Sequence, residues 1–306
     1  MSDGALPSAT RNPAVQGIAL MVTAVLLFAT MDMLVKLAAD EGIPIGQILF
    51  ARNFFAFIPV LWMVRRAGGF AAVRTRNYRG HLFRSLVGMG AMVCFFLSYR
   101  ALPLGEAVAL GSAGTIFMTA LSVPLLGEKV GPRRWTAVFV GFTGVLVMTR
   151  PGMGVFDPGA LYALGGATCY AIAMISIRHL SRTESSVAIV FHFTLILTVG
   201  GALSLPFAFK LPDVEELLLL VGIGLIGGTA QFAMTGAFRC APIGLIAPFD
   251  YLALVFAMLF GYFIWGDVPD AFLIVGAAIV VASGLYILHR EAALARARPI
   301  DPQPHP

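Results

Sequence analysis

The sequence predicts an all-α membrane protein with ten transmembrane helices in two inverted five-helix repeats, and three observations support this prediction. Of the 306 residues, 58% are hydrophobic and only 12% are charged, whereas soluble domains contain about 25% charged residues. Apolar stretches long enough to cross a bilayer recur along the whole chain. The second half of the chain also repeats the residue pattern of the first half.

Ten mainly apolar segments qualify as spanning helices, which need about 20 such residues. In chain order they are 17–39, 46–64, 82–101, 104–126, 135–149, 159–178, 187–208, 217–238, 243–265 and 271–289. These segments do not alternate between apolar and polar residues, as the strands of a membrane barrel do. Only two connections are longer than a tight turn, the Arg- and Gly-rich stretch 65–81 and the Pro- and Gly-rich stretch 150–158.

The internal repeat is visible as matching residues at a nearly constant offset. SYRALPLG (98–105) is followed 139 residues later by AFRCAPIG (237–244), and GFTGVLVMTR (141–150) is matched by VASGLYILHR (281–290). The match divides the chain into an N-terminal tail (1–16), a first repeat (17–149), a linker (150–158), a second repeat (159–289) and a C-terminal tail (290–306). Because each repeat has an odd number of helices, the second repeat must insert inverted, which places a binding site near the midplane between the repeats.

The distribution of Lys and Arg predicts that both termini are cytoplasmic, because cytoplasmic loops retain these residues during insertion. With the N-terminus inside, only Arg100, Arg150 and Lys210 fall on the outer face. Sixteen of the 21 Lys and Arg residues fall on the cytoplasmic face: Arg11, Arg65, Arg66, Arg74, Arg76, Arg79, Arg84, Lys129, Arg133, Arg134, Arg178, Arg182, Arg239, Arg290, Arg296 and Arg298. The sequence pI near 9.4 therefore reflects membrane orientation, and we expect no binding of nucleic acid.

Several classes of site lack their sequence motifs. Cys94, Cys169 and Cys240 lie in apolar runs without CxxC spacing, so we expect neither a disulfide framework nor a metal site. The chain has no DDxxD, HExxH or GxSxG sequence, which argues against an intramembrane transferase, the alternative from the enzyme class. It also lacks a Walker A sequence, so a permease subunit would need a separate ATPase. No cofactor is expected.

Two charged residues are predicted at matching depth in the first two spans. Asp32 lies about fifteen residues into the first span and Arg52 lies about six residues into the second, which places them at similar depth at 1.5 Å per residue. Lys36 is one turn from Asp32 and is a second possible partner. Because charges within a span are costly, we expect either a structural ion pair or a charge cluster that meets a polar substrate.

Polar residues in the second repeat provide further candidates. His192 corresponds to Arg52 at an offset of 140 residues; it is either a proton relay, since histidine titrates near neutral pH, or a packing residue. Gln231 is a hydrogen-bonding candidate, and Tyr99, in the first repeat, could stack on a flat ligand.

The ninth predicted span contains a proline followed by an acidic residue. Pro248 should interrupt the helix and free a backbone carbonyl, which is tolerated where that group lines a cavity. We therefore expect the carboxylate of Asp250, and Tyr251 beside it, to face the central cavity. The alternative is an ion pair between Asp250 and Arg239.

The residues also carry a family resemblance. The ten helices in two repeats, the GE at the end of the fourth predicted span and the run APFDYLALVFAMLFGYFIWGDVPD (247–270) resemble the EamA-domain branch of the drug/metabolite transporter superfamily over residues 17–290. The resemblance implies a bacterial inner-membrane carrier for a small metabolite that works without ATP. Within that branch, the APxxYxxL pattern (247–254) is most similar to riboflavin and S-adenosylmethionine importers.

Together these observations predict a secondary transporter that works by alternating access. The first candidate activity is uptake of a cofactor precursor such as riboflavin. Uptake of S-adenosylmethionine and export of amino acids or drug-like metabolites stay open, as do a monomer and a homodimer. The expected partners are a small-molecule substrate and the lipid bilayer, and the predicted substrate-binding residues are Asp32, Arg52, Tyr99, His192, Gln231, Asp250 and Tyr251.

Overall fold

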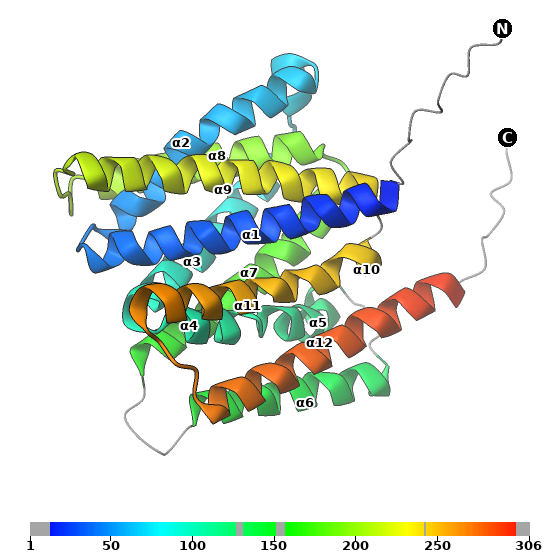
Figure 1. The fold of residues 1–306 in the computed structure, drawn as a ribbon. Coiled ribbons are helices and arrows are strands. Elements are labelled where there is room, and N and C mark those ends of the chain that lie inside the picture. The colour runs from blue at the N-terminus through cyan, green and yellow to red at the C-terminus, as the bar shows by residue number, and fades with distance from the viewer. Residues whose placement is uncertain (1–12, 127–130, 151–156, 242, 298–306) are drawn as a thin grey trace, which may run out of the picture.

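The computed structural model describes residues 13–126, 131–150, 157–241 and 243–297, and every regular element in these residues is helical (Figure 1). Nine described helices are long and apolar enough to cross a membrane, and the apolar stretch Trp135–Thr149 is shorter. The predicted all-α membrane fold is confirmed. The elements are α1 (Pro13–Asp40), α2 (Ile45–Arg66), η1 (Gly69–Val73), α3 (Tyr78–Ala101), α4 (Leu104–Gly111), α5 (Gly114–Leu126), α6 (Pro132–Thr149), α7 (Pro158–Leu180), α8 (Ser186–Ser204), α9 (Val214–Cys240), α10 (Ile243–Ile246), η2 (Ala247–Tyr251), α11 (Leu252–Phe260), the π-helical turn η3 (Gly261–Trp265) and α12 (Ala271–Ala297).

Several helices begin at residues whose side chains cap the first turn. The Asp213 carboxylate accepts a hydrogen bond from the backbone N–H of Glu216, and the Glu216 carboxylate accepts one from the N–H of Asp213, a capping box that begins α9. Asn77, Asp157 and Ser185 cap α3, α7 and α8 in the simpler way, with one side-chain oxygen each. These oxygens satisfy N–H groups that have no partner within the helix.

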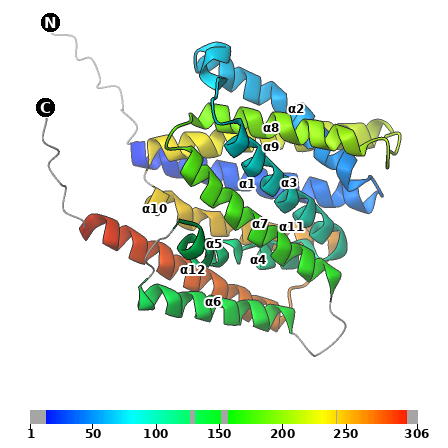
Figure 2. The same cartoon turned by 180° about the vertical axis from the view of Figure 1, so that it is seen from behind.

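The two halves of the chain run in opposite directions. Helix α1 begins, and α12 ends, at the right of Figure 1, which we call the terminal end; the other side of the molecule is the opposite end. Helix α7, which corresponds to α1 in the second half, runs the other way, and the view from behind agrees (Figure 2). The packing is reciprocal as well, because α1 packs along α9 and its counterpart α7 packs along α3. This arrangement is the one expected of inverted repeats.

The fourth and ninth predicted spans are interrupted at corresponding places. The segment 104–126, predicted as one helix, is divided into α4 and α5 at Ser112 and Ala113. The segment 243–265 is divided into α10, the 3-10 turn η2 and α11, with Pro248 in the turn. Proline explains the second break because it lacks an N–H and clashes with the preceding turn. The first break was not predicted, and no proline lies within it.

Several predicted boundaries also need correction: α1 begins at Pro13, within the predicted tail 1–16, and α3 begins at Tyr78 rather than at 82. The seventh predicted span, 187–208, is too long at its end, since α8 stops at Ser204. Pro206 follows two residues later and cannot continue a helix. The tenth predicted span ended at 289 and was followed by a tail, but α12 continues to Ala297. The sequence REAALARA (290–297) consists of strong helix formers with charged residues among them. The hydrophobicity criterion therefore ended the helix too early.

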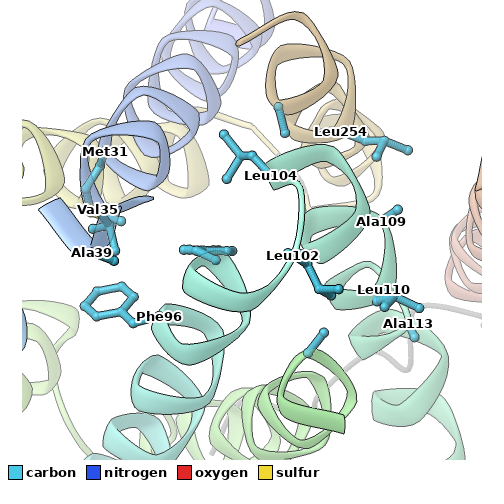
Figure 3. Packing of buried hydrophobic residues seen from close by; sticks show 14 of the residues in the cluster. Met31, Val35, Ala39, Phe96, Leu102, Leu104, Ala109, Leu110, Ala113 and Leu254 are labelled. Atoms are coloured by element: carbon cyan, nitrogen blue, oxygen red, sulfur yellow. The ribbon is translucent and has the colours of Figure 1, made fainter. Parts of the chain in front are cut away.

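Small residues allow the helices to approach closely. A Cβ atom on Gly224 or Gly228 of α9 would overlap Phe55 or Pro59 of α2, and a Cβ on Gly144 of α6 would lie 2.7 Å from the Gly276 carbonyl oxygen of α12. Such contacts replace the hydrophobic driving force that is missing between helices in lipid. The buried cluster where α1, α3, α4 and α11 meet includes Met31, Val35, Ala39, Phe96, Leu102, Leu104, Ala109, Leu110, Ala113 and Leu254 (Figure 3).

Candidate functional site

Three of the predicted site residues come together from three helices. The Tyr99 hydroxyl of α3 donates a hydrogen bond to the Asp32 carboxylate of α1, and the charge of Arg52 on α2 acts on the same carboxylate. Tyr99 and Arg52 are buried, and Asp32 is half-buried. The matched depth predicted for Asp32 and Arg52 therefore does bring them into one polar group.

Within this group, Arg52 is not fully satisfied. Its Nη1 donates a hydrogen bond to Asn53 Oδ1 over 2.9 Å, and Asn53 in turn donates to the carbonyl oxygen of Leu49. Its Nε is buried without a hydrogen-bond partner, and no described carboxylate forms an ion pair with Arg52 within 4.0 Å. The predicted pair is thus an electrostatic interaction over a longer distance. Asn53, which was not among the predicted residues, occupies one of the donors.

Lys36 does not act as a partner of Asp32. Its Nζ donates hydrogen bonds to the carbonyl oxygens of Tyr99 and Leu102, over 2.9 and 3.0 Å, and lies 3.9 Å from Asp40 Oδ1. The side chain therefore points toward the opposite end and away from the interior. The sequence allowed Lys36 to point toward either Asp32 or Asp40, because both lie four residues away on the same face of the helix.

Asp250 and Tyr251 point in different directions, although both lie at the break in the ninth span. The Asp250 side chain is exposed and interacts electrostatically with Tyr170 of α7. The Tyr251 hydroxyl is buried, lies directly against Gly284 of α12 and interacts with Thr115 of α5. The described residues include no ion pair between Asp250 and Arg239, which was the alternative partner. Tyr251 therefore packs against α12, and Asp250 faces α7, the first helix of the same repeat.

Tyr170 occupies the space between the two helix breaks. Its ring lies beside Gly114, the first residue after the break between α4 and α5, where an added Cβ would lie 3.0 Å from the ring. The residue is 38% exposed and interacts with both Asp250 and Arg84, which come from two other elements. Side chains from α7, η2 and α3 therefore come together here. We call the space bounded by Tyr170, Asp250 and Arg84 the interior space.

His192 lies apart from the Asp32 group, in a cluster near the terminal end. Its ring centroid is 4.4 Å from that of His81 on α3, and its Nδ1 lies 2.8 Å from the Ala188 carbonyl oxygen. His81 Nε2 is 3.6 Å from the Glu184 carboxylate, which also accepts a hydrogen bond from Thr75. His192 matches Arg52 in the sequence repeat, but the two residues have different surroundings in the structure.

Gln231 is half-buried on α9, one turn from Gly227. An added Cβ on Gly227 would lie 3.5 Å from Arg52 Nε, so this face of α9 is directed at the Asp32 group. Among the described residues, the amide of Gln231 makes no hydrogen bond that would hold it in place. It lies on the path between the Asp32 group and the terminal end.

A separate pocket lies at the opposite end, and none of the predicted site residues lines it. Its volume is about 150 Å³, and its lining includes Glu106, Asp267 and the ion pair of Arg150 with Asp270. The described residues contain no group of three His, Cys, Asp or Glu side chains that could hold a metal ion.

The predicted site residues did not include Arg84 or Tyr170. Arg84 was counted among the cytoplasmic charges, yet it is a buried residue of α3 that interacts with Arg52. Its position inside the predicted span 82–101 was a usable signal, because charges within spans tend to face cavities or one another. Tyr170 had no such signal, since aromatic residues are common throughout the chain.

Comparison with known proteins identifies both repeats. A model described as the EamA-like transporter family matches residues 15–150 and again residues 157–288. A "Riboflavin transporter" of Rhizobium johnstonii is 29% identical over 91% of this chain and 92% of its own length. An "S-adenosylmethionine uptake transporter" of Rickettsia prowazekii is 29% identical over 80% of this chain and 83% of its own length. A "Pseudopaline exporter CntI" of Pseudomonas aeruginosa is 28% identical, over 87% and 94% respectively.

Proposed function

Because the chain belongs to the EamA-like transporter family, we propose that it takes up a small polar metabolite across a bacterial inner membrane, with riboflavin as the first candidate. The observation that carries this proposal is the interior space between two interrupted helices, where Asp250 and Tyr170 are exposed. Interrupted segments at corresponding positions of two inverted repeats are where such carriers bind their substrates. The interior space is therefore the proposed substrate site.

The contacts between helices support alternating access. Helix α1 packs against α3, where Lys36 joins the two helices, whereas the corresponding pair α7 and α9 makes no comparable contact in the described residues. Inverted repeats exchange such contacts when the site opens to the other side. We assign the structure to the state that is closed at the opposite end. With the predicted positive-inside orientation, its interior space opens toward the cytoplasm.

The chemistry of the interior space suits riboflavin. An ionised carboxylate only accepts hydrogen bonds and can bind two hydroxyl groups at once, so Asp250 can hold a polyol chain. The aromatic ring of Tyr170 provides a face on which a flat ring system can stack, which contributes about 0.5–1.5 kcal/mol beyond burial. The similarity to a named riboflavin transporter points to the same substrate.

Uptake of riboflavin is tested by growth and by direct transport. A riboflavin auxotroph without its own uptake system should grow at low external riboflavin when it expresses this protein, but not when it expresses Asp250→Ala at equal membrane abundance. Glu215→Gln, which alters an exposed acidic residue of α9, is the matched control and should support growth. The intact protein in liposomes should also accumulate labelled riboflavin. If the inserted protein neither restores growth nor transports riboflavin, this substrate is excluded.

S-adenosylmethionine is the second candidate substrate, because the Asp250 carboxylate could also bind a sulfonium cation and a relative carries that name. The same liposomes distinguish the two by competition: an excess of unlabelled S-adenosylmethionine should leave riboflavin uptake unchanged if riboflavin is the substrate. Liposomes preloaded with labelled substrate test the direction, since the similarity to a pseudopaline exporter keeps export open.

A further inference from the structure

We infer that Arg84 binds the substrate directly and selects molecules that carry hydrogen-bond acceptors at one end and donors at the other, with Asp250 holding the donor end. The inference rests on the proposed function only in assuming that the interior space is the substrate site. It adds a second charged residue to that site and a chemical class for the ligand.

The first observation is that Arg84 is buried without a partner. The side chain is 9% exposed, and its Nε and Nη1 are enclosed but make no hydrogen bond. Its Nη2 also makes no hydrogen bond with any described residue, although it is not enclosed. A guanidinium always carries its charge and offers five N–H donors. A folded protein rarely leaves so many buried donors unused.

The acidic residues nearby are already occupied. Glu184, in the cluster at the terminal end, accepts a hydrogen bond from Thr75 and lies 3.6 Å from His81. Asp32 is bound to Tyr99 and faces Arg52. No ion pair within 4.0 Å joins Arg84 to a carboxylate in the described part of the chain.

The second observation is that Arg84 is held in a fixed orientation. Its Cζ lies 3.6 Å from the ring centroid of Phe193 on α8. Gly88, one turn further along α3, leaves room for this stack, because a Cβ there would lie 2.8 Å from the Phe193 ring and 3.3 Å from Arg84 Nη1. Stacking on an aromatic face orients the guanidinium plane but leaves its N–H groups, which lie in that plane, free to bind.

The third observation is that Tyr170 interacts with the opposite charges of Arg84 and Asp250. Asp250 itself has no direct interaction with Arg84. Arg52 also acts on Arg84 and increases the positive charge on that side. The interior space is therefore positive along α3 and negative at the break in the ninth span.

A space with this polarity fits a defined class of molecules. The guanidinium fork binds two acceptor atoms at once, such as two carbonyl oxygens on a ring edge or a carboxylate. The Asp250 carboxylate accepts from hydroxyl groups or an ammonium. Riboflavin has a dicarbonyl ring edge and a polyol chain, and a zwitterionic metabolite has a carboxylate and an ammonium. Both satisfy the proposal, and the experiment distinguishes them.

The test compares ligands that lack one end. Riboflavin and lumiflavin, which has the same ring but no polyol, are titrated onto purified protein by quenching of flavin fluorescence. Arg84→Gln should weaken the binding of both flavins at least about tenfold, because it removes the charged fork that meets the ring. Asp250→Asn should weaken only riboflavin. Arg79→Gln, an exposed arginine of the same helix, should change neither. Wild-type affinity for both flavins in folded Arg84→Gln would overturn the inference.

A result without flavin binding separates the two proposals. If wild-type protein binds no flavin, riboflavin is excluded as the substrate. Binding of a panel of zwitterionic amino acids is then measured with the same variants. Independently of any ligand, Arg84→Cys in a background without the three native cysteines should react with a water-soluble thiol reagent, as should Asp250→Cys. Reaction at position 250 without reaction at position 84 would show that Arg84 does not face the interior space.

Discussion

Lys36 donates a hydrogen bond from its Nζ to the carbonyl oxygen of Tyr99 over 2.9 Å, and this contact joins α1 to the end of α3. The same ammonium binds the Leu102 carbonyl oxygen and lies 5.4 Å from the ring centroid of Trp265. Trp265 Nε1 donates to Asp40 Oδ2 over 2.9 Å. One cation therefore connects three helical segments at the opposite end, the end that we propose is closed.

Lys36→Met should loosen this closure. The change leaves two backbone carbonyls without their charged donor, at a cost of about 1–3 kcal/mol. The protein should then open more often at the opposite end. A cysteine introduced by Leu104→Cys, at a position that is fully buried at this end, should react faster with an impermeant thiol reagent. Arg100→Gln, an exposed residue of the same end, is the control, and an equal rate in both variants would contradict the assignment of Lys36.

Neutralising Asp32 or Arg52 alone should harm the protein more than neutralising both. A single change leaves the remaining charge without its opposite charge in the interior, where an uncompensated charge is unfavourable. Asp32→Asn combined with Arg52→Gln should recover membrane abundance, measured by immunoblot of isolated membranes. Recovery of abundance without transport would place the pair in the substrate path. Failure to recover abundance would show that the electrostatic interaction between them is not important for folding.

The contact between Tyr251 and Gly284 predicts a compensating pair of mutations. Gly284→Ala should lower thermal stability by about 1–3 kcal/mol, because the added methyl group overlaps the Tyr251 hydroxyl. Tyr251→Phe removes the hydroxyl that the methyl group overlaps, together with its interaction with Thr115, so alone it should lower stability by no more than about 1 kcal/mol. The double variant should regain most of the lost stability in a thermal unfolding assay. Gly131→Ala, where an added Cβ meets nothing within 4 Å, controls for the loss of glycine.

Membrane orientation is testable by labelling from each side. In a background without native cysteines, Arg74→Cys should react from the cytoplasm and Val268→Cys from outside. Both positions are exposed, and they lie in connections at the two ends of the helices. The prediction follows from the sixteen Lys and Arg residues assigned to one face. Labelling of both positions from the same side would contradict the inverted arrangement.

The sequence alone determined the class of fold, the number of spans and the two-repeat organisation. These features depend on local properties, since a spanning helix is set by the length of an apolar run and a repeat by matching residues at one offset. The break at Pro248 was predictable for the same reason, because proline acts on its own helix. The common depth of Asp32 and Arg52 followed from the rise of a helix per residue.

The tertiary structure alone decided which polar groups meet. Lys36 had acceptors on either side, and the carbonyls of Tyr99 and Leu102, from another helix, determined its direction. From the sequence, Arg84 was assigned to the cytoplasmic surface. In the structure it stacks on Phe193 of α8 and interacts with Tyr170 of α7. Depth along a helix follows from sequence position, whereas the direction of a side chain around the helix depends on how neighbouring helices pack. That packing joins residues far apart in the chain, and for this reason no local pattern revealed it.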